Sequence, residues 1–192
     1  MYTTRSIRWI LLTFVLALGA CAGGTGNEPG DQNRDTYPEG PYGNAEGDIL
    51  DNHSFETADG AAFDFDADIF KDEGAKLMLL STAAGWCTSC IEEQSSLQAL
   101  HEEHAADGLR VVVTLFEDQN FEAADDVLAS EWIDTHDIEF DVVVDAPFVM
   151  EDYYDATLTP MLMFVDVNTM EILSITTGWD ESLVDALIDA SL

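Results

Sequence analysis

The chain has 192 residues, enough for one domain with short appendages. It is 47% hydrophobic and contains 10 Phe, 5 Tyr and 4 Trp, so it can build a core and is not a disordered chain. Six Lys and Arg against 39 Asp and Glu give a net charge of −33, which would repel phosphate groups and excludes nucleic-acid binding. Three cysteines are too few for a disulfide scaffold, so each must be considered separately.

A positively charged start and a short apolar run open the chain. Arg5 and Arg8 precede residues 9–18, which carry no charge. A run this short is typical of a secretion signal rather than of a membrane-spanning helix. The sequence Leu-Gly-Ala-Cys that ends at Cys21 resembles the lipobox of bacterial lipoproteins, in which the cysteine becomes the lipidated N-terminus. We therefore expect residues 1–20 to be a lipoprotein signal peptide; a plain signal peptide and an uncleaved anchor are the alternatives.

A segment rich in turn-forming residues follows the lipobox. Residues 22–47 contain seven Gly, three Pro and three Asn, a composition that predicts a flexible tether over residues 21–46. The folded domain is then expected over residues 47–192. The tether would hold this domain outside the cytoplasm, on a bacterial membrane. Ala22 stands where an Asp would retain some lipoproteins in the inner membrane, which slightly favours the outer membrane.

Strands and helices are predicted to alternate from residue 76 onward. Apolar or β-branched runs predict buried strands, and segments with apolar residues at helical spacing predict helices. The predicted strands are residues 76–80, 109–116, 140–144, 161–165 and 172–176, the last two forming a hairpin. The predicted helices are residues 90–106, a segment that includes Phe121 and Trp132, a short stretch over 148–154 and a closing segment that includes Leu183 and Ile188. This order predicts an α/β fold with a central mixed sheet flanked by helices on both faces.

Residues 86–90 form the motif Trp-Cys-Thr-Ser-Cys, where a predicted strand leads into a predicted helix. The first turn of a helix has unpaired N–H groups and a partial positive charge, so a thiolate there is stabilised and its pKa falls below about 8.5. Two cysteines three residues apart can also form a disulfide across the start of the helix. We expect Cys87 to be exposed and to attack, and Cys90 to be buried and to resolve.

This arrangement resembles the thioredoxin fold, and especially the membrane-tethered, extracytoplasmic proteins related to redoxins and cytochrome-maturation reductases. The Trp-Cys-x-x-Cys motif follows a buried strand, and a helix followed by a strand comes next. Thr159 and Pro160 stand just before another predicted strand, and Gly178 precedes the final helix. The resemblance covers about residues 47–192.

The resemblance implies a role for each residue of the site. Cys87 would be the nucleophile that forms a mixed disulfide with a protein thiol or disulfide, and Cys90 the resolving thiol. Pro160 would be a cis proline, the backbone of Thr159 would pair with the substrate, and Trp86 would shield the site. Such an enzyme uses no organic cofactor and no metal, and it exchanges electrons with a membrane donor or acceptor.

The chain departs from thioredoxin at two places. Thioredoxin has a buried acid six residues before its first cysteine, where this chain has Ser81. Glu93 occupies the position of a glutamate common in the tethered relatives, and we hypothesise that it replaces this acid as the proton acceptor for Cys90. The residues between the cysteines are Thr88 and Ser89, whose hydroxyls can donate hydrogen bonds to a thiolate and raise the reduction potential.

Other interpretations of the two cysteines stay open. They could form an inert structural disulfide, or the chain could be a non-enzymatic protein of the same fold that delivers metal or binds a partner. Zinc requires four ligands and the chain has no second Cys-x-x-Cys, while a copper chaperone could use His136 but normally has a longer cysteine spacing. A thiol peroxidase would need a Thr three residues before its cysteine, where this chain has Ala84, and a supporting Arg such as Arg110.

Overall fold

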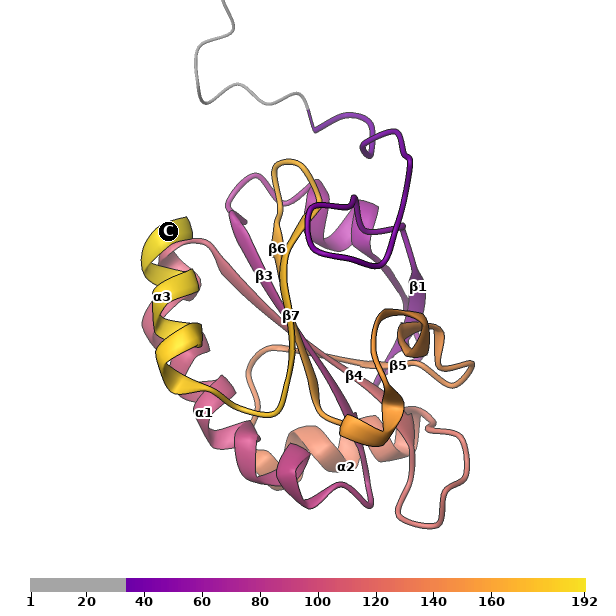
Figure 1. The fold of residues 1–192 in the computed structure, drawn as a ribbon. Helices are drawn as coiled ribbons and strands as arrows, with labels where there is room; N and C mark the ends of the chain where they lie inside the picture. The colour runs from indigo at the N-terminus through magenta and orange to yellow at the C-terminus, as the bar shows by residue number, and fades with distance from the viewer. Residues whose placement is uncertain (1–33) are drawn as a thin grey trace, which may run out of the picture. The chain divides into compact units, whose positions relative to one another are not determined.

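The structure is a computed structural model that describes residues 34–192. The predicted signal peptide, Cys21 and the first half of the predicted tether lie outside the described residues. Seven strands form one sheet in the order β2-β1-β5-β4-β3-β6-β7 (Figure 1). In chain order they are β1 (Ser54–Thr57), β2 (Ala62–Asp64), β3 (Leu77–Ala84), β4 (Leu109–Glu117), β5 (Asp141–Val144), β6 (Met161–Asp166) and β7 (Glu171–Thr177).

The sheet is mixed, as the alternation of elements predicted. β3 pairs in parallel with β4, and β4 with β5, whereas β6 is antiparallel to both β3 and β7. The predicted hairpin therefore forms one end of the sheet, with β7 as its edge. The other end is a β1–β2 hairpin that the sequence analysis did not predict, because these strands have only four and three residues.

Within residues 34–192, three α-helices and four shorter helical segments accompany the strands. The α-helices are α1 (Thr88–His104), α2 (Asp126–His136) and α3 (Glu181–Ser191). The shorter segments are the π-helix η1 (Phe65–Phe70) and the 3₁₀ helices η2 (Ala105–Asp107), η3 (Val149–Tyr153) and η4 (Ala156–Leu158). Within residues 34–192, none of these helices has the length and apolar character needed to cross a membrane.

The start of α2 differs from the sequence prediction. We expected its apolar face to include Phe121, but Phe121 has a φ of 65° and is 67% exposed. The helix begins only after Asp125, whose side chain accepts a hydrogen bond from the backbone N–H of Leu128. This cap fixes the helix start five residues further along the chain than Phe121.

The two faces of the sheet are covered by different kinds of structure. All three α-helices contribute residues to one apolar cluster, including Leu97, Trp132 and Ile188 (Figure 1). The opposite face packs against η1 and η3, with Phe65 and Met150 fully buried there. Every residue of β3 is buried, because this central strand contacts both clusters. Both faces are therefore covered, but the long helices lie on one of them.

The second half of the predicted tether, residues 34–46, contacts the folded domain. The Tyr37 hydroxyl donates a hydrogen bond of 2.9 Å to the Leu50 carbonyl, and the Tyr37 ring lies 5.5 Å from the ring of Phe70. The Arg34 guanidinium donates hydrogen bonds to four oxygen acceptors: the carbonyls of Phe70, Asp72 and Ala75 and the side chain of Asn168. Residues 34–46 therefore contact the domain, because Gly and Pro exclude regular structure without excluding contacts.

We expect Arg34→Ala to lower the free energy of unfolding by about 2 kcal/mol, since several charge-assisted hydrogen bonds are lost together. Arg34→Lys is the matched control, because it keeps the charge but lacks the planar fork that reaches separate acceptors. Urea denaturation of both variants measures the effect. Wild-type stability in Arg34→Lys would mean that charge alone, and not the hydrogen-bond geometry, matters at this position.

Acidic side chains far outnumber basic ones on this domain. All four basic side chains within residues 34–192, Arg34, Lys71, Lys76 and Arg110, are hydrogen-bonded to oxygens of the domain itself. Four cations are far fewer than the acidic side chains of the domain, so like charges repel across its surface. An acidic surface of this kind suits a salty environment, where ions screen the repulsion.

We therefore expect added salt to stabilise the protein. Raising NaCl from about 0.01 M to about 1 M shortens the Debye length from about 30 Å to about 3 Å. We expect a gain on the order of 1 kcal/mol, which would raise the melting temperature by about 2–4 °C. Thermal denaturation followed by circular dichroism at several salt concentrations measures this, and a melting temperature independent of salt would contradict it.

Candidate active site

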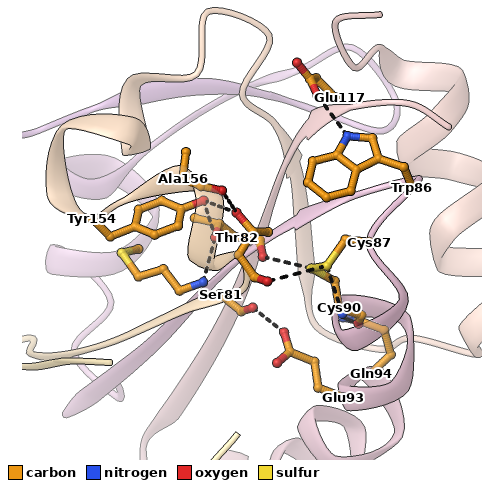
Figure 2. The surroundings of a disulfide bond; sticks show 12 residues. Ser81, Thr82, Trp86, Cys87, Cys90, Glu93, Gln94, Glu117, Tyr154 and Ala156 are labelled. Atoms are coloured by element: carbon orange, nitrogen blue, oxygen red, sulfur yellow. Dashed lines mark hydrogen bonds between the residues drawn. A yellow bond between two sulfur atoms is a disulfide. The ribbon is translucent and has the colours of Figure 1, made fainter. Parts of the chain in front are cut away.

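The two cysteines of the motif lie between the end of β3 and the start of α1. They form a disulfide with an S–S length of 2.09 Å and a Cα–Cα distance of 5.3 Å (Figure 2). Cys87 is the N-cap of α1, and its sulfur accepts a hydrogen bond of 3.1 Å from the backbone N–H of Cys90. The first turn of α1 carries no acidic side chain, in a chain with 39 acidic residues. The positive end of the helix therefore acts directly on Cys87 and favours its thiolate.

Cys90 is more deeply buried than Cys87, as predicted, but Cys87 is buried as well. Cys90 is fully buried, and Cys87 is only 4% exposed, so our expectation of an exposed Cys87 was wrong for the oxidised form. Trp86 next to it is 36% exposed and donates a hydrogen bond of 2.8 Å to Glu117. This bond holds the indole ring at the surface beside the disulfide (Figure 2).

Trp86 contacts two further aromatic rings beside the disulfide, one exposed and one buried. The Trp86 ring stacks on Phe121 at 5.5 Å and meets the edge of Phe116 at 6.1 Å. Gly85 permits this contact, because a Cβ at residue 85 would lie 2.6 Å from the backbone nitrogen of Gln119. The loop that carries Phe121 can therefore approach the motif closely only while residue 85 has no side chain.

Thr159 and Pro160 lie beside the disulfide, with the cis peptide bond that the family resemblance implied. The Thr159 carbonyl oxygen is 3.9 Å from the sulfur of Cys87. The backbone N–H of Gly178 donates a hydrogen bond of 2.9 Å to the Pro160 carbonyl, which ties this loop to the segment before α3. The structure therefore brings Thr159 and Pro160 beside the two cysteines, as the sequence analysis expected, although Thr159 follows Cys90 by 69 positions in the chain.

Glu93 lies one turn after Cys90 on α1 and is 4% exposed. Its Oε1 accepts a hydrogen bond of 2.5 Å from the hydroxyl of Ser81, the residue that replaces the acid of thioredoxin (Figure 2). Its Oε2 is buried and has no hydrogen-bond partner within residues 34–192. Burial raises the pKa of Glu93 to about 7, and the Ser81 hydrogen bond opposes this rise. The carboxyl group therefore changes its protonation state near neutral pH.

A pocket of about 370 Å³ opens between the start of α1 and the segment before α3. Glu93 and Pro160 both contribute to its wall, so it adjoins the candidate site. Its lining residues are Ser89, Glu92, Glu93, Ser96, Pro160, Gly178 and Trp179.

The structure also shows where the residues lie that a metal-delivery protein or a thiol peroxidase would use. The ring of His136 packs against Trp132 at 4.8 Å, at the C-terminal end of α2. Within residues 34–192, no group of three or more His, Cys, Asp or Glu side chains is arranged to hold a metal ion. Arg110 is engaged in ion pairs with Asp72 and Asp141 at the start of β4.

Sequence reasoning missed two residues of this site. Thr82, a buried residue of β3, has its carbonyl oxygen 3.7 Å from the sulfur of Cys90, and its hydroxyl donates a hydrogen bond of 3.0 Å to the hydroxyl of Tyr154. The sequence signal for Thr82 was its place in a pair of hydroxyl residues, Ser81 and Thr82, within a mainly apolar segment. Tyr154 carried no signal beyond a position close to Thr159 in the chain.

The fold and the Cys-x-x-Cys disulfide define a thioredoxin-like protein. Comparison with known protein families gives a match to the AhpC/TSA family over residues 48–171, and the chain belongs to this family. The thioredoxin-like protein YneN of Bacillus subtilis (strain 168) is 28% identical over 120 residues, which are 62% of this chain. The chain spans 64% of the length of that relative.

Solved structures share the fold at low sequence identity. The thiol-disulfide oxidoreductase from Bacteroides fragilis superposes with a TM-score of 0.60 at 18% identity, over 74% of this chain and 98% of that one. The exposed lipoprotein thioredoxin Etrx1 from Streptococcus pneumoniae superposes with a TM-score of 0.57 at 18% identity, over 72% and 99% of the two chains. These likenesses confirm the predicted thioredoxin-like α/β fold.

Proposed function

We propose that the protein is an extracytoplasmic thiol–disulfide oxidoreductase that works by dithiol–disulfide exchange through Cys87 and Cys90. The thiolate of Cys87 would attack a disulfide of a protein substrate and form a mixed disulfide. The thiolate of Cys90 would then attack Cys87, release the substrate as a dithiol and restore the disulfide seen here. Read in reverse, the same steps would oxidise a substrate dithiol. Trp86 would cover the site, and the backbone of Thr159, next to Pro160, would pair with an extended segment of the substrate.

One observation supports this proposal most strongly. The Cys87–Cys90 disulfide caps the N-terminus of α1 and faces the Thr159 carbonyl across a distance of 3.9 Å. A structural disulfide has no need of a helix terminus that stabilises a thiolate, nor of a neighbouring backbone segment that precedes an antiparallel strand. The similarity to a thiol-disulfide oxidoreductase of known structure agrees with this assignment.

We further propose that Glu93 accepts the proton of Cys90. It lies on the same side of α1 as Cys90, one turn further on. Its carboxyl group accepts a hydrogen bond from Ser81, the residue that replaces the acid of thioredoxin. A carboxyl group whose pKa is raised to about 7 can both take and return a proton near neutral pH.

The reduction potential of the Cys87–Cys90 pair in glutathione buffers tests the proposed function. A value near about −270 mV would indicate a reductase fed by a membrane electron donor, and one near about −120 mV an oxidant that installs disulfides. A disulfide that resists reduction below about −300 mV would be structural, and the proposal would then fail. The measurement also gives the direction in which electrons flow.

Peroxidase chemistry is the less favoured alternative. The position three residues before Cys87 is Ala84, which is buried in β3 and has no hydroxyl to offer a peroxide. Arg110 is held by two carboxylates at the opposite end of the neighbouring strand. Metal delivery lacks a third ligand beside the two cysteines within the described residues.

We also propose that Cys21 carries a lipid that anchors the protein on the periplasmic side of a bacterial membrane, with the outer membrane slightly favoured. The lipobox-like sequence supports this, as does the similarity to an exposed lipoprotein thioredoxin. Metabolic labelling with a palmitate analogue tests the proposal. Label that is present in the wild type and absent from Cys21→Ala supports the anchor; label that persists in Cys21→Ala contradicts it.

A further inference from the structure

A continuous chain of hydrogen bonds runs beside the disulfide. The backbone N–H of Met161 donates to the Thr82 hydroxyl oxygen at 2.9 Å, and the Thr82 hydroxyl donates to the Tyr154 hydroxyl at 3.0 Å. The Tyr154 and Thr159 hydroxyls are 2.8 Å apart. The Thr159 hydroxyl donates to the carbonyl of Ala156 at 2.9 Å (Figure 2).

The two ends of this chain fix its direction. A backbone N–H can only donate and a carbonyl can only accept, and each hydroxyl has a single hydrogen to give. Since the Thr159 hydrogen goes to Ala156, the Tyr154 hydroxyl must donate to Thr159 while it accepts from Thr82. Each of the three hydroxyls therefore donates once and accepts once, and removal of the middle one leaves a donor and an acceptor unpaired.

The chain connects the surroundings of both sulfurs. Its two threonines are the residues whose carbonyl oxygens face the disulfide: Thr82 at 3.7 Å from the sulfur of Cys90, and Thr159 at 3.9 Å from the sulfur of Cys87. The Tyr154 hydroxyl is hydrogen-bonded to both threonines and to neither sulfur. Its hydroxyl thus links β3 to the loop that ends at Pro160.

Reduction changes the hydrogen-bonding capacity of the sulfur atoms beside these carbonyl groups. When the Cys87–Cys90 bond is broken by glutathione, two glutathione thiols supply two electrons and two protons and become glutathione disulfide. The buried Cys90 then carries a hydrogen in its thiol form and can donate a weak hydrogen bond to the Thr82 carbonyl, which no disulfide sulfur can. A carbonyl oxygen held in place beside Cys90 therefore stabilises the reduced form relative to the oxidised one.

We propose that Tyr154 is a positioning residue of the redox site. Its hydroxyl, which is also hydrogen-bonded to Thr159, holds Thr82 so that the Thr82 carbonyl oxygen accepts a hydrogen bond from the reduced Cys90, which favours the reduced form. This inference rests on the proposed exchange at Cys87 and Cys90, and it adds a residue that controls the equilibrium of that exchange.

The test compares two neighbouring tyrosines. Tyr154→Phe removes only the central hydroxyl of the chain, whereas Tyr153→Phe removes a hydroxyl that is bonded to His53 at 2.7 Å. Each reduced variant is equilibrated in glutathione buffers and the dithiol fraction is measured by thiol trapping. We expect Tyr154→Phe to lower the equilibrium constant for reduction about fivefold, the value of one hydrogen bond, which is about 20 mV towards a more negative potential. We expect Tyr153→Phe to keep the wild-type constant.

A second pair of variants covers the case in which Tyr154→Phe does not fold. Thr82→Val removes the first hydroxyl of the chain, and Thr82→Ser keeps it. We expect Thr82→Val to shift the equilibrium in the same direction as Tyr154→Phe, and Thr82→Ser to restore the wild-type value.

The outcomes separate this inference from the proposed function. An unchanged equilibrium constant in Tyr154→Phe, or equal shifts in Tyr154→Phe and Tyr153→Phe, would overturn the positioning role while leaving the exchange reaction intact. A wild-type disulfide that resists glutathione and dithiothreitol alike would instead overturn the proposed function.

Discussion

Cys87→Ser should abolish exchange, and Cys90→Ser should trap the substrate. Without Cys87 the protein has no thiolate at the N-terminus of α1, so we expect disulfide reduction to fall by at least about a hundredfold, to the rate of the reductant alone. Without Cys90 the mixed disulfide at Cys87 has no resolving thiol. We expect a covalent adduct that mass spectrometry detects at Cys87 and that dithiothreitol releases.

The third cysteine provides the control for this experiment. Cys21→Ser makes the same replacement of sulfur by oxygen at a cysteine outside residues 34–192. It should leave the exchange rate in solution at the wild-type value. An adduct that accumulates on Cys90 in a Cys87→Ser variant would reverse the two assigned roles. Full activity in Cys87→Ser would exclude this disulfide from the reaction.

Glu93→Gln should change how turnover depends on pH. If Glu93 accepts the proton of Cys90, the wild-type rate rises as pH increases through about 7, where the carboxyl group ionises. The amide cannot accept this proton, so we expect the variant to lose the inflection and about a hundredfold in rate. Glu92→Gln is the matched control, because Glu92 is the exposed neighbour in the same turn of α1. An unchanged pH profile in Glu93→Gln would exclude Glu93 as the proton acceptor.

The same substitution should change stability in a pH-dependent way. The pKa of Glu93 is raised in the folded protein, from 4.5 to about 7, so the folded state binds this proton more tightly than the unfolded state does. The resulting stabilisation is fully present below pH 4.5 and is lost as pH rises through about 7. We expect Glu93→Gln to be more stable relative to the wild type at pH 8 than at pH 5, as measured by urea denaturation at both values.

Local patterns were sufficient to predict the centre of this fold. β3 begins with the apolar run of residues 77–80 and α1 contains no Gly or Pro, so the position of the cysteine motif between them followed directly from the sequence. Thr159 and Pro160 could be placed beside the disulfide only through the family resemblance. Their proximity depends on the antiparallel pairing of β6 with β3, which no local pattern encodes.

The parts that could not be predicted depend on contacts between distant residues. The hydroxyl of Thr82 in a buried strand requires a partner, but one sequence does not reveal that the partner is Tyr154, 72 residues away. The π-helix η1 and the strands β1 and β2 are too short to produce a recognisable period. The start of α2, in contrast, could have been predicted, because Asp125 is a strong N-cap residue and its capping signal is present in the sequence.

Arg34 and the disulfide lie at opposite ends of the central strand β3. Arg34 is hydrogen-bonded to residues just before β3 and to the turn after β6, whereas the disulfide follows the last residue of β3. The strand between them has eight residues, so these two points are separated by about 25 Å along the sheet. A bead or electrode attached immediately before Arg34 would therefore lie at the end of β3 away from the disulfide. Large proteins could reach Cys87 in such a device without passing the surface that carries it.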